Sequence, residues 1–210
     1  SEKAGGVVMA HGGPFNGYAL VVLKGKPTFM VRSGKQLATA TAKIKVTNKW
    51  IHLAGVLTKD KQMRLYVNGE LAAEAKAPGL IESVPVQGLQ VGADDGSAVG
   101  DYTTPFPFKG EVDEGRVYHR ALNEQEMTKL ADWGNEPKDK SLVLYSGFEK
   151  GKAIDDSGNK HLGKLSGVNI VRAKTGQAIH FTGKSTPGGG GPGVEHHWTQ
   201  DIPILVRAMA

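Results

Sequence analysis

The 210-residue sequence contains no cysteine, which excludes disulfide bonds and cysteine-ligated metal sites. It also lacks any apolar stretch near the roughly 20 residues that a membrane-spanning helix requires. Lys and Arg are spread along the chain without a long basic run, so the net charge of +5 is more typical of a mixed solvated surface than of a nucleic-acid site. We therefore expect neither membrane insertion nor a nucleic-acid partner.

Short apolar runs separated by turn residues recur along the chain, which contains 29 glycines. Examples are Tyr18 to Leu23, Ile44 to Val46, Trp50 to Leu57 and Glu111 to Tyr118. No alternation of strands with long helices, as in a parallel α/β protein, is visible. This spacing predicts an all-β fold, a two-sheet antiparallel β-sandwich with one short helix.

Two local elements have specific signals. Asn68-Gly69 lies between two strand-like runs and favours the positive φ angles of a type I′ hairpin turn. Asn123, with Glu126 three residues later, forms the pattern of a capping box and predicts the start of the helix. Gly134 predicts its end.

Two segments have the composition of connections. Residues 135–141 are polar and contain Pro137, so we interpret them as a linker. Residues 186–193 consist of Gly, Pro and one Thr, which predicts an exposed and mobile loop.

Four motifs in the first two-thirds of the chain resemble the laminin-G-like, concanavalin A-like lectin-glucanase jelly-roll family of bacterial secreted and surface proteins. The segment from Trp50 to Val56 is similar to the family's W-x-H-x-A-G strand, and the segment from Met63 to Gly69 to its L-Y-V-N-G hairpin. Val91 to Asp94 resembles the I-G-x-D strand end, and Phe108 to Leu122 the F-x-G-x-I-D-E-V-R-I-Y-x-R-A-L ending. Gly115 departs from this ending where the family has an apolar residue, so a bulge is expected there.

The order of the segments differs from that of the family. Leu142 to Glu149 and Gly176 to Gly183 resemble the family's beginning, yet they follow its ending. One hypothesis is a single permuted domain over 1–210, in which 1–134 is the family's middle and end, 135–141 the linker and 142–210 its beginning. The alternative is one domain over 1–134 and the start of a second over 142–210. We favour the first, because a partial second copy would leave strand edges unpaired.

Two acidic loops contain the candidate ligand-binding residues. Asp94, Asp95, Asp101 and Tyr102 lie in a Gly-rich loop after a predicted strand, where side chains can converge on a glycan. Asp155, Asp156 and Asn159 lie in a second loop, and their oxygens suit a structural Ca²⁺, which related modules often hold. The alternative for both loops is a set of Asx turns without an ion.

Glu111 and Asp113 are candidates for a catalytic role, because some glycosidases of this fold carry three carboxylates on one strand. Gly115 and Arg116 occupy the places of the third acid, so we expect no catalytic residues and no enzyme activity. Tyr102 and Phe106 are the aromatic side chains with the best prospects of exposure.

Three functions remain in order of preference. The first is a non-catalytic accessory module of a larger secreted or envelope protein that binds a carbohydrate, and the second is a structural or protein-interaction module without a small ligand. A concanavalin A-like glycosidase is third. The resemblance implies an extracytoplasmic location and other domains of the parent protein as partners.

Overall fold

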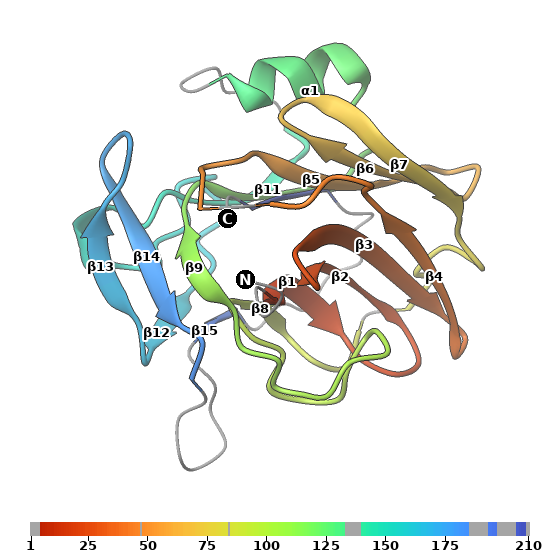
Figure 1. The fold of residues 1–210 in the computed structure, drawn as a ribbon, viewed down its shortest axis with the longest axis horizontal. Coiled ribbons are helices and arrows are strands. Elements are labelled where there is room, and N and C mark those ends of the chain that lie inside the picture. The colour runs from red at the N-terminus through yellow and green to blue at the C-terminus, as the bar shows by residue number, and fades with distance from the viewer. Residues whose placement is uncertain are drawn as a thin grey trace.

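Three antiparallel sheets make up the part of the chain that the structure, a computed structural model, describes: residues 5–46, 48–83, 85–132, 140–184, 193–196 and 205–208 (Figure 1). The seven-stranded sheet contains, in spatial order, β12 (Gly163–Ser166), β15 (Gly193–His196), β8 (Leu89–Val91), β1 (Gly6–Gly12), β2 (Gly17–Leu23), β3 (Lys26–Ser33) and β4 (Gln36–Thr41). The six-stranded sheet contains β11 (Leu142–Ser146), β10 (Gly115–Tyr118), β16 (Leu205–Ala208), β5 (Leu53–Leu57), β6 (Gln62–Val67) and β7 (Glu70–Lys76). The three-stranded sheet contains β13 (Asn169–Arg172), β14 (Gln177–Thr182) and β9 (Lys109–Val112).

The two large sheets face each other across an apolar core, which confirms the predicted β-sandwich (Figure 1). Leu20 and Phe29 from the seven-stranded sheet and Leu53 and Leu65 from the six-stranded sheet are fully buried in it. Burial of each such side chain contributes about 1.5–3 kcal/mol to folding. The small sheet, which the sequence did not predict, closes one side of the sandwich and adds Ile179 and Phe181 to the same core.

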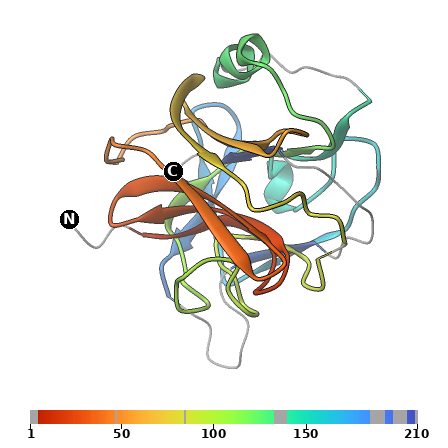
Figure 2. The same ribbon diagram turned by 90° about the vertical axis from the view of Figure 1, so that its right-hand side faces the viewer.

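The outer faces of both large sheets are also covered (Figure 2). Helix α1 (Glu124–Ala131) places Met127 and Leu130 against the six-stranded sheet. The connection between β8 and β9, residues 92–108, crosses the seven-stranded sheet and covers Val7 and Ala19. Strand β1 is therefore buried at every position rather than at alternate ones.

The two predicted local elements are confirmed. Asn68 and Gly69 have φ angles of 52° and 82°, as a type I′ turn between β6 and β7 requires. The Asn123 side chain accepts a hydrogen bond from the Glu126 N–H at 3.0 Å, and the Glu126 carboxylate accepts one from the Asn123 N–H at 2.8 Å. This capping box begins α1 at the predicted residue, and the helix ends at Ala131.

The second segment of the chain, residues 140–184, pairs with strands of the first. Strand β11 pairs with β10, from Gly115 opposite Ser146 to Tyr118 opposite Leu142. Strand β14 pairs with β9, and a short 3₁₀ helix, η1 (Glu149–Gly151), lies between β11 and β12 in the chain. The segment that resembles the family's beginning therefore pairs with the segment that resembles its ending. That both segments form one permuted domain remains a prediction.

Two predicted strands are different in the structure. Ile44 to Val46 is not a strand; the preceding β4 pairs with β3, and Val46 only donates a backbone hydrogen bond to Gly25 O at 2.7 Å. The run from Glu111 to Tyr118 is two strands in different sheets, because Glu114 adopts a left-handed φ of 57° between them. The irregularity expected at Gly115 is therefore a complete break of the strand.

The predicted connections fall almost entirely outside the described residues. Of the linker 135–141, only Lys140 and Ser141 are described, and of the loop 186–193, only Gly193, which begins β15. Gly134, the predicted helix end, also lies outside them.

Candidate functional site

The crossing loop, residues 92–108, contains the predicted glycan-binding residues and packs on the outer face of the seven-stranded sheet. Val99 is fully buried there, and Phe106 O accepts a hydrogen bond from the Val7 N–H at 2.9 Å. The loop is thereby fixed to the sheet along its length. The structure brings four predicted residues onto this one loop: Asp94, Asp95, Asp101 and Tyr102.

Asp94 and Tyr102 form a buried pair that holds the crossing loop in place. The Tyr102 hydroxyl donates to Asp94 Oδ2 at 2.6 Å, and Asp94 is 1% exposed. Burial raises the pKa of Asp94, and burial together with the Asp94 charge raises the pKa of Tyr102, so the phenol stays a hydrogen-bond donor. Tyr102 and Phe106 are stacked with ring centroids 5.5 Å apart, and both are half-buried rather than exposed as expected.

Asp101 lies on the accessible side of the same loop, whereas Asp95 is half-buried. The Asp101 carboxylate is 86% exposed and pairs with the Arg32 guanidinium at 3.2 Å. Arg32 also donates to Val99 O at 2.5 Å, which positions the guanidinium over the loop. The four predicted residues therefore divide into an inner pair, Asp94 and Tyr102, that stabilises the loop, an outer residue, Asp101, that faces solvent, and the half-buried Asp95.

An exposed aromatic ring, Phe15, lies at the same end of the seven-stranded sheet and was missed in the sequence. The residue is 59% exposed, and the Lys35 ammonium lies 5.2 Å from the ring centroid. Val86 nearby in the adjoining loop is fully exposed. The signal was present: Gly-Gly-Pro before Phe15 and Asn-Gly after it indicate a turn tip, where an aromatic side chain has no core to enter.

Side-chain hydrogen bonds connect the turns around Phe15 into one surface. Asn16 Oδ1 accepts from the Gly34 N–H at 3.0 Å, and Asn16 Nδ2 donates to Ser83 Oγ at 2.7 Å. Gln87 Oε1 accepts from the Ser97 N–H at 3.0 Å, which joins the neighbouring loop to the crossing loop. We call this region the loop-end surface and define it by Phe15, Asn16, Lys35, Gln87 and Asp101.

The predicted calcium loop is a turn organised around Asp155. Its side chain is fully buried, and its two oxygens accept backbone N–H bonds from Tyr145 at 3.2 Å, Ser157 at 2.9 Å and His161 at 3.0 Å. Asn159 Nδ2 donates to Val143 O at 2.8 Å, whereas Asp156 is exposed. Nowhere in the described part of the chain do three or more acidic or His side chains converge in the manner of a metal site. Calcium binding by this turn remains a prediction.

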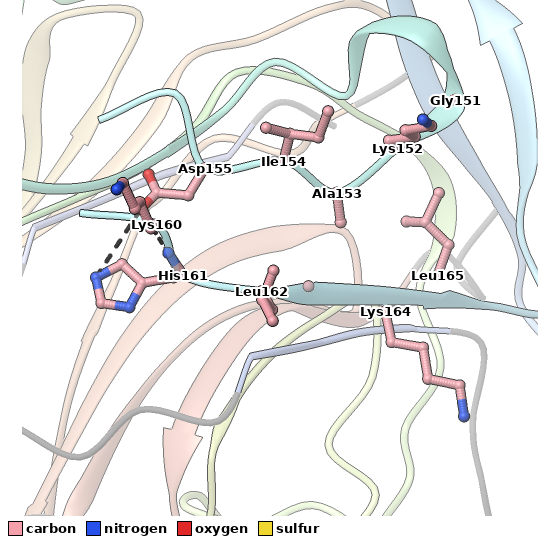
Figure 3. Close-up of a pocket in the computed structure, with 11 residues that line it drawn as sticks. Gly151, Lys152, Ala153, Ile154, Asp155, Lys160, His161, Leu162, Lys164 and Leu165 are labelled. Carbon is pink, nitrogen blue, oxygen red and sulfur yellow. Dashed lines mark hydrogen bonds and ion pairs between the residues drawn. The ribbon is translucent and has the colours of Figure 1, made fainter. Parts of the chain in front are cut away.

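Beside the Asp155 turn lies a hollow of about 630 Å³ between two arms of the chain, 151–155 and 160–165 (Figure 3). Ala153, Ile154, Leu162 and Leu165 supply its apolar side chains (Figure 3). Three lysines also border it: Lys152, Lys160 and Lys164. The volume is within the range of small-ligand sites.

The carboxylates considered for catalysis lie in different environments. Glu111 is 38% exposed in its side chain and lies 3.7 Å from His180 Nδ1 on the neighbouring β14. Asp113 follows the end of β9 and is 1% exposed, and its Oδ2 has no hydrogen-bond partner among the described residues. Burial, with the charges of Glu114 and Glu149, raises the pKa of Asp113 to about 7.

Arg116, which stands in a possible place of the third acid, is part of the contact between the two chain segments. Its guanidinium forms an ion pair with Glu114 and lies 4.3 Å from the centroid of the Tyr145 ring on β11. The Tyr145 hydroxyl in turn donates to Glu114 Oε1 at 2.9 Å. These side chains stabilise the β10–β11 pairing.

Comparison with protein families gives one match that covers more than half of the chain. The profile of the concanavalin A-like lectin/glucanases superfamily matches residues 1–128. No curated protein matches the chain. Among the described residues, no helix has both the length and the apolar character to cross a membrane.

Two solved structures resemble this one. A candidate carbohydrate binding protein from Bacteroides ovatus is 20% identical with a TM-score of 0.54, and the alignment covers 97% of this chain. This chain spans only 52% of that protein's length. An S-layer domain-containing protein from Clostridium thermocellum is 22% identical over 57% of this chain and 58% of its own, with a TM-score of 0.31.

Proposed function

Because the chain belongs to the concanavalin A-like lectin/glucanases superfamily, we propose that it is a non-catalytic module of a larger protein that binds carbohydrate at the loop-end surface. The observation that carries the proposal is the exposed Phe15 ring, held beside polar side chains on hydrogen-bonded turns. The name of the Bacteroides ovatus neighbour, whose fold this chain shares, agrees with a carbohydrate ligand.

The loop-end surface has the two chemical features that sugar recognition uses. An aromatic ring offers an apolar platform for the C–H face of a pyranose, and nearby oxygens and amides hydrogen-bond its hydroxyls. Phe15 supplies the platform, and Asp101 supplies exposed carboxylate oxygens. Asp95 and Asp101 therefore contact the ligand in this proposal, whereas Asp94 and Tyr102 keep the crossing loop in position.

The placement of the carboxylates supports a non-catalytic role. A glycosidase needs two carboxyl groups on either side of one scissile bond. Here Glu111 is half-exposed beside His180, whereas Asp113 is buried beyond the strand break. A module of this kind acts by binding, outside the cytoplasm, next to other domains of the parent protein.

The binding should be weak, because a surface built on turns buries little of a sugar. We expect dissociation constants from about micromolar to millimolar, which corresponds to about 4–8 kcal/mol. A glycan array identifies the ligand, and calorimetry then compares the wild type with Phe15→Ala and Asp101→Ala. Phe15→Ala should abolish measurable binding, and Asp101→Ala should weaken it.

Ile44→Ala is the matched control, because Ile44 is similarly exposed, at 52%, outside the loop-end surface. It should bind as the wild type does. Binding that survives Phe15→Ala would show that the ligand lies elsewhere. No binding across the array would favour the second function, a structural or protein-interaction module. The buried pair of Asp94 and Tyr102, which stabilises the crossing loop, also supports that function. Release of reducing sugars that Glu111→Gln abolishes would instead establish a glycosidase.

A further inference from the structure

Three lysines, Lys152, Lys160 and Lys164, lie around the hollow beside the Asp155 turn. Residues 150–174, which include these lysines, contain six basic and two acidic side chains, a net charge of +4. The three lysines are up to 12 positions apart in the sequence, but the antiparallel bridge between Ile154 and Leu162 brings the arms 151–155 and 160–165 side by side (Figure 3). Charges that form no basic run in the sequence are thereby gathered on one part of the fold.

The three lysines that border the hollow are available to a ligand. Lys152, Lys160 and Lys164 are exposed, and none forms an ion pair within the part of the chain that the structure describes. The one acidic side chain in the lining, Asp155, is fully buried and accepts three backbone N–H bonds, so little of its negative charge is presented to solvent. The accessible charge of the hollow is therefore positive.

The rest of the lining is apolar and unusually accessible. Leu162 is 89% exposed and Ile154 45% exposed, although both are large aliphatic side chains. The two residues form an isolated antiparallel bridge, which fixes the arms of the hollow relative to each other. Exposed apolar side chains bordered by charge are typical of binding sites.

We infer that this hollow is a second binding site, which takes an acidic sugar unit bearing carboxylate or sulfate groups. The lysine ammonium groups neutralise the anionic groups, and Leu162 and Ile154 contact the apolar face of the sugar ring. Compact lysine charges beside an apolar surface fit a sugar ring that bears anionic groups. The choice of a glycan rests on the proposed function, whereas the site itself rests on charge and exposure.

The test uses the full chain and three probes: dextran, dextran sulfate and oligosaccharides of polygalacturonate. We expect binding to the sulfated or carboxylated probe and none to dextran, with an affinity that falls as salt is added. The variant Lys152→Ala, Lys160→Ala, Lys164→Ala should bind about tenfold more weakly, since each exposed ion pair contributes a factor of up to about five. Leu162→Ser should also weaken binding, which general attraction to charge would not explain.

A control variant removes the same charge elsewhere: Lys43→Ala, Lys45→Ala, Lys129→Ala, all at exposed positions. It should bind the acidic probe as the wild type does, and both variants should melt as the wild type does. Equal loss in the two variants, or none in the first, would overturn the inference. A single-stranded oligonucleotide bound as tightly through the same lysines would overturn the assignment to a glycan. Phe15→Ala, which tests the proposed function, should leave binding of the acidic probe unchanged.

Discussion

The crossing loop and the Asp155 turn both contain Gly, Asp and an amide or hydroxyl side chain, but they use them differently. In the crossing loop, Asp94 bonds to the Tyr102 side chain, and the loop is pressed onto the sheet. In the Asp155 turn, the carboxylate accepts three backbone N–H bonds and also lies 3.9 Å from His161 Nε2, and an open hollow remains beside it. An acidic residue in a Gly-rich loop thus identifies a well-fixed loop, and the accessible surface next to it decides whether a ligand can bind.

Removal of the second segment is the most severe way to test how far the two regions depend on each other. A chain of residues 1–134 loses β11 and β14, and with them the burial of Ile179 and Phe181 against the core. We expect it not to fold, because several large apolar side chains are lost at about 1.5–3 kcal/mol each. Circular dichroism during heating provides the measurement. A cooperative melt of residues 1–134 would show that two domains, rather than one permuted domain, are present.

The pH dependence of stability tests the junction between the two segments, where Asp113 is buried. Its pKa is about 7 in the folded state and 3.8 as a free side chain, so folding disfavours the charged form. The stability contributed by the neutral carboxyl is complete below pH 3.8 and is lost as the pH rises to about 7. At 1.36 kcal/mol for each pKa unit, the loss is at most about 4 kcal/mol.

Asp113→Asn should remove this loss, so that unfolding by urea at a series of pH values gives a flatter profile than the wild type. The exposed Asp156→Asn is the control and should leave the profile unchanged. An Asp113→Asn profile as steep as that of the wild type would mean that Asp113 is charged in the folded protein.

The calcium hypothesis concerns only one of the two acidic loops, the Asp155 turn. The sequence places the ion at Asp155, Asp156 and Asn159, and an ion at 100 times its dissociation constant would raise the free energy of unfolding by about 2.7 kcal/mol. The hypothesis therefore predicts a higher melting midpoint with Ca²⁺ than with a chelator, and no such difference in Asp156→Ala. Identical midpoints for the wild type would leave only the backbone role of the turn.

The smallest effects concern the inner and outer residues of the crossing loop. Tyr102→Phe leaves the buried Asp94 carboxylate without its strongest donor and should cost about 1–3 kcal/mol of stability. Asp101→Ala removes an exposed ion pair and should cost less than about 1 kcal/mol. Urea unfolding of the two variants measures both values. Equal losses would contradict the division into inner and outer residues.

A local element could be predicted from the sequence where the residues that determine it are neighbours in the chain. The Asn68-Gly69 turn depends on adjacent residues and the capping box on Asn123 and Glu126, three positions apart, and both formed as expected. The break at Glu114 was not predicted, because a left-handed φ at a non-glycine residue is imposed by the two sheets that β9 and β10 join.

The candidate site was predicted in part. Asp94 and Tyr102 are eight positions apart, and their contact depends on the loop between them lying against the outer face of a sheet. Continuous apolar runs such as those of β1 and β2 are typical of strands that are buried on both faces, but they do not identify the segment that covers the second face. The group of lysines at the hollow was not predicted, because the lysines are scattered in the sequence and only the turn after Asp155 brings them together.

Because both faces of the seven-stranded sheet are covered, fewer codons of its strands can change during evolution without loss of stability. In a sheet with one solvated face, every second codon of a strand can drift among polar residues at little cost. In β2, Leu20 faces the core between the sheets and Ala19 the crossing loop, and each is fully buried. Adjacent codons in β1 and β2 are therefore under comparable selection, and a saturation-mutagenesis map should show continuous bands of intolerance there, in contrast to the alternating pattern of edge strand β4.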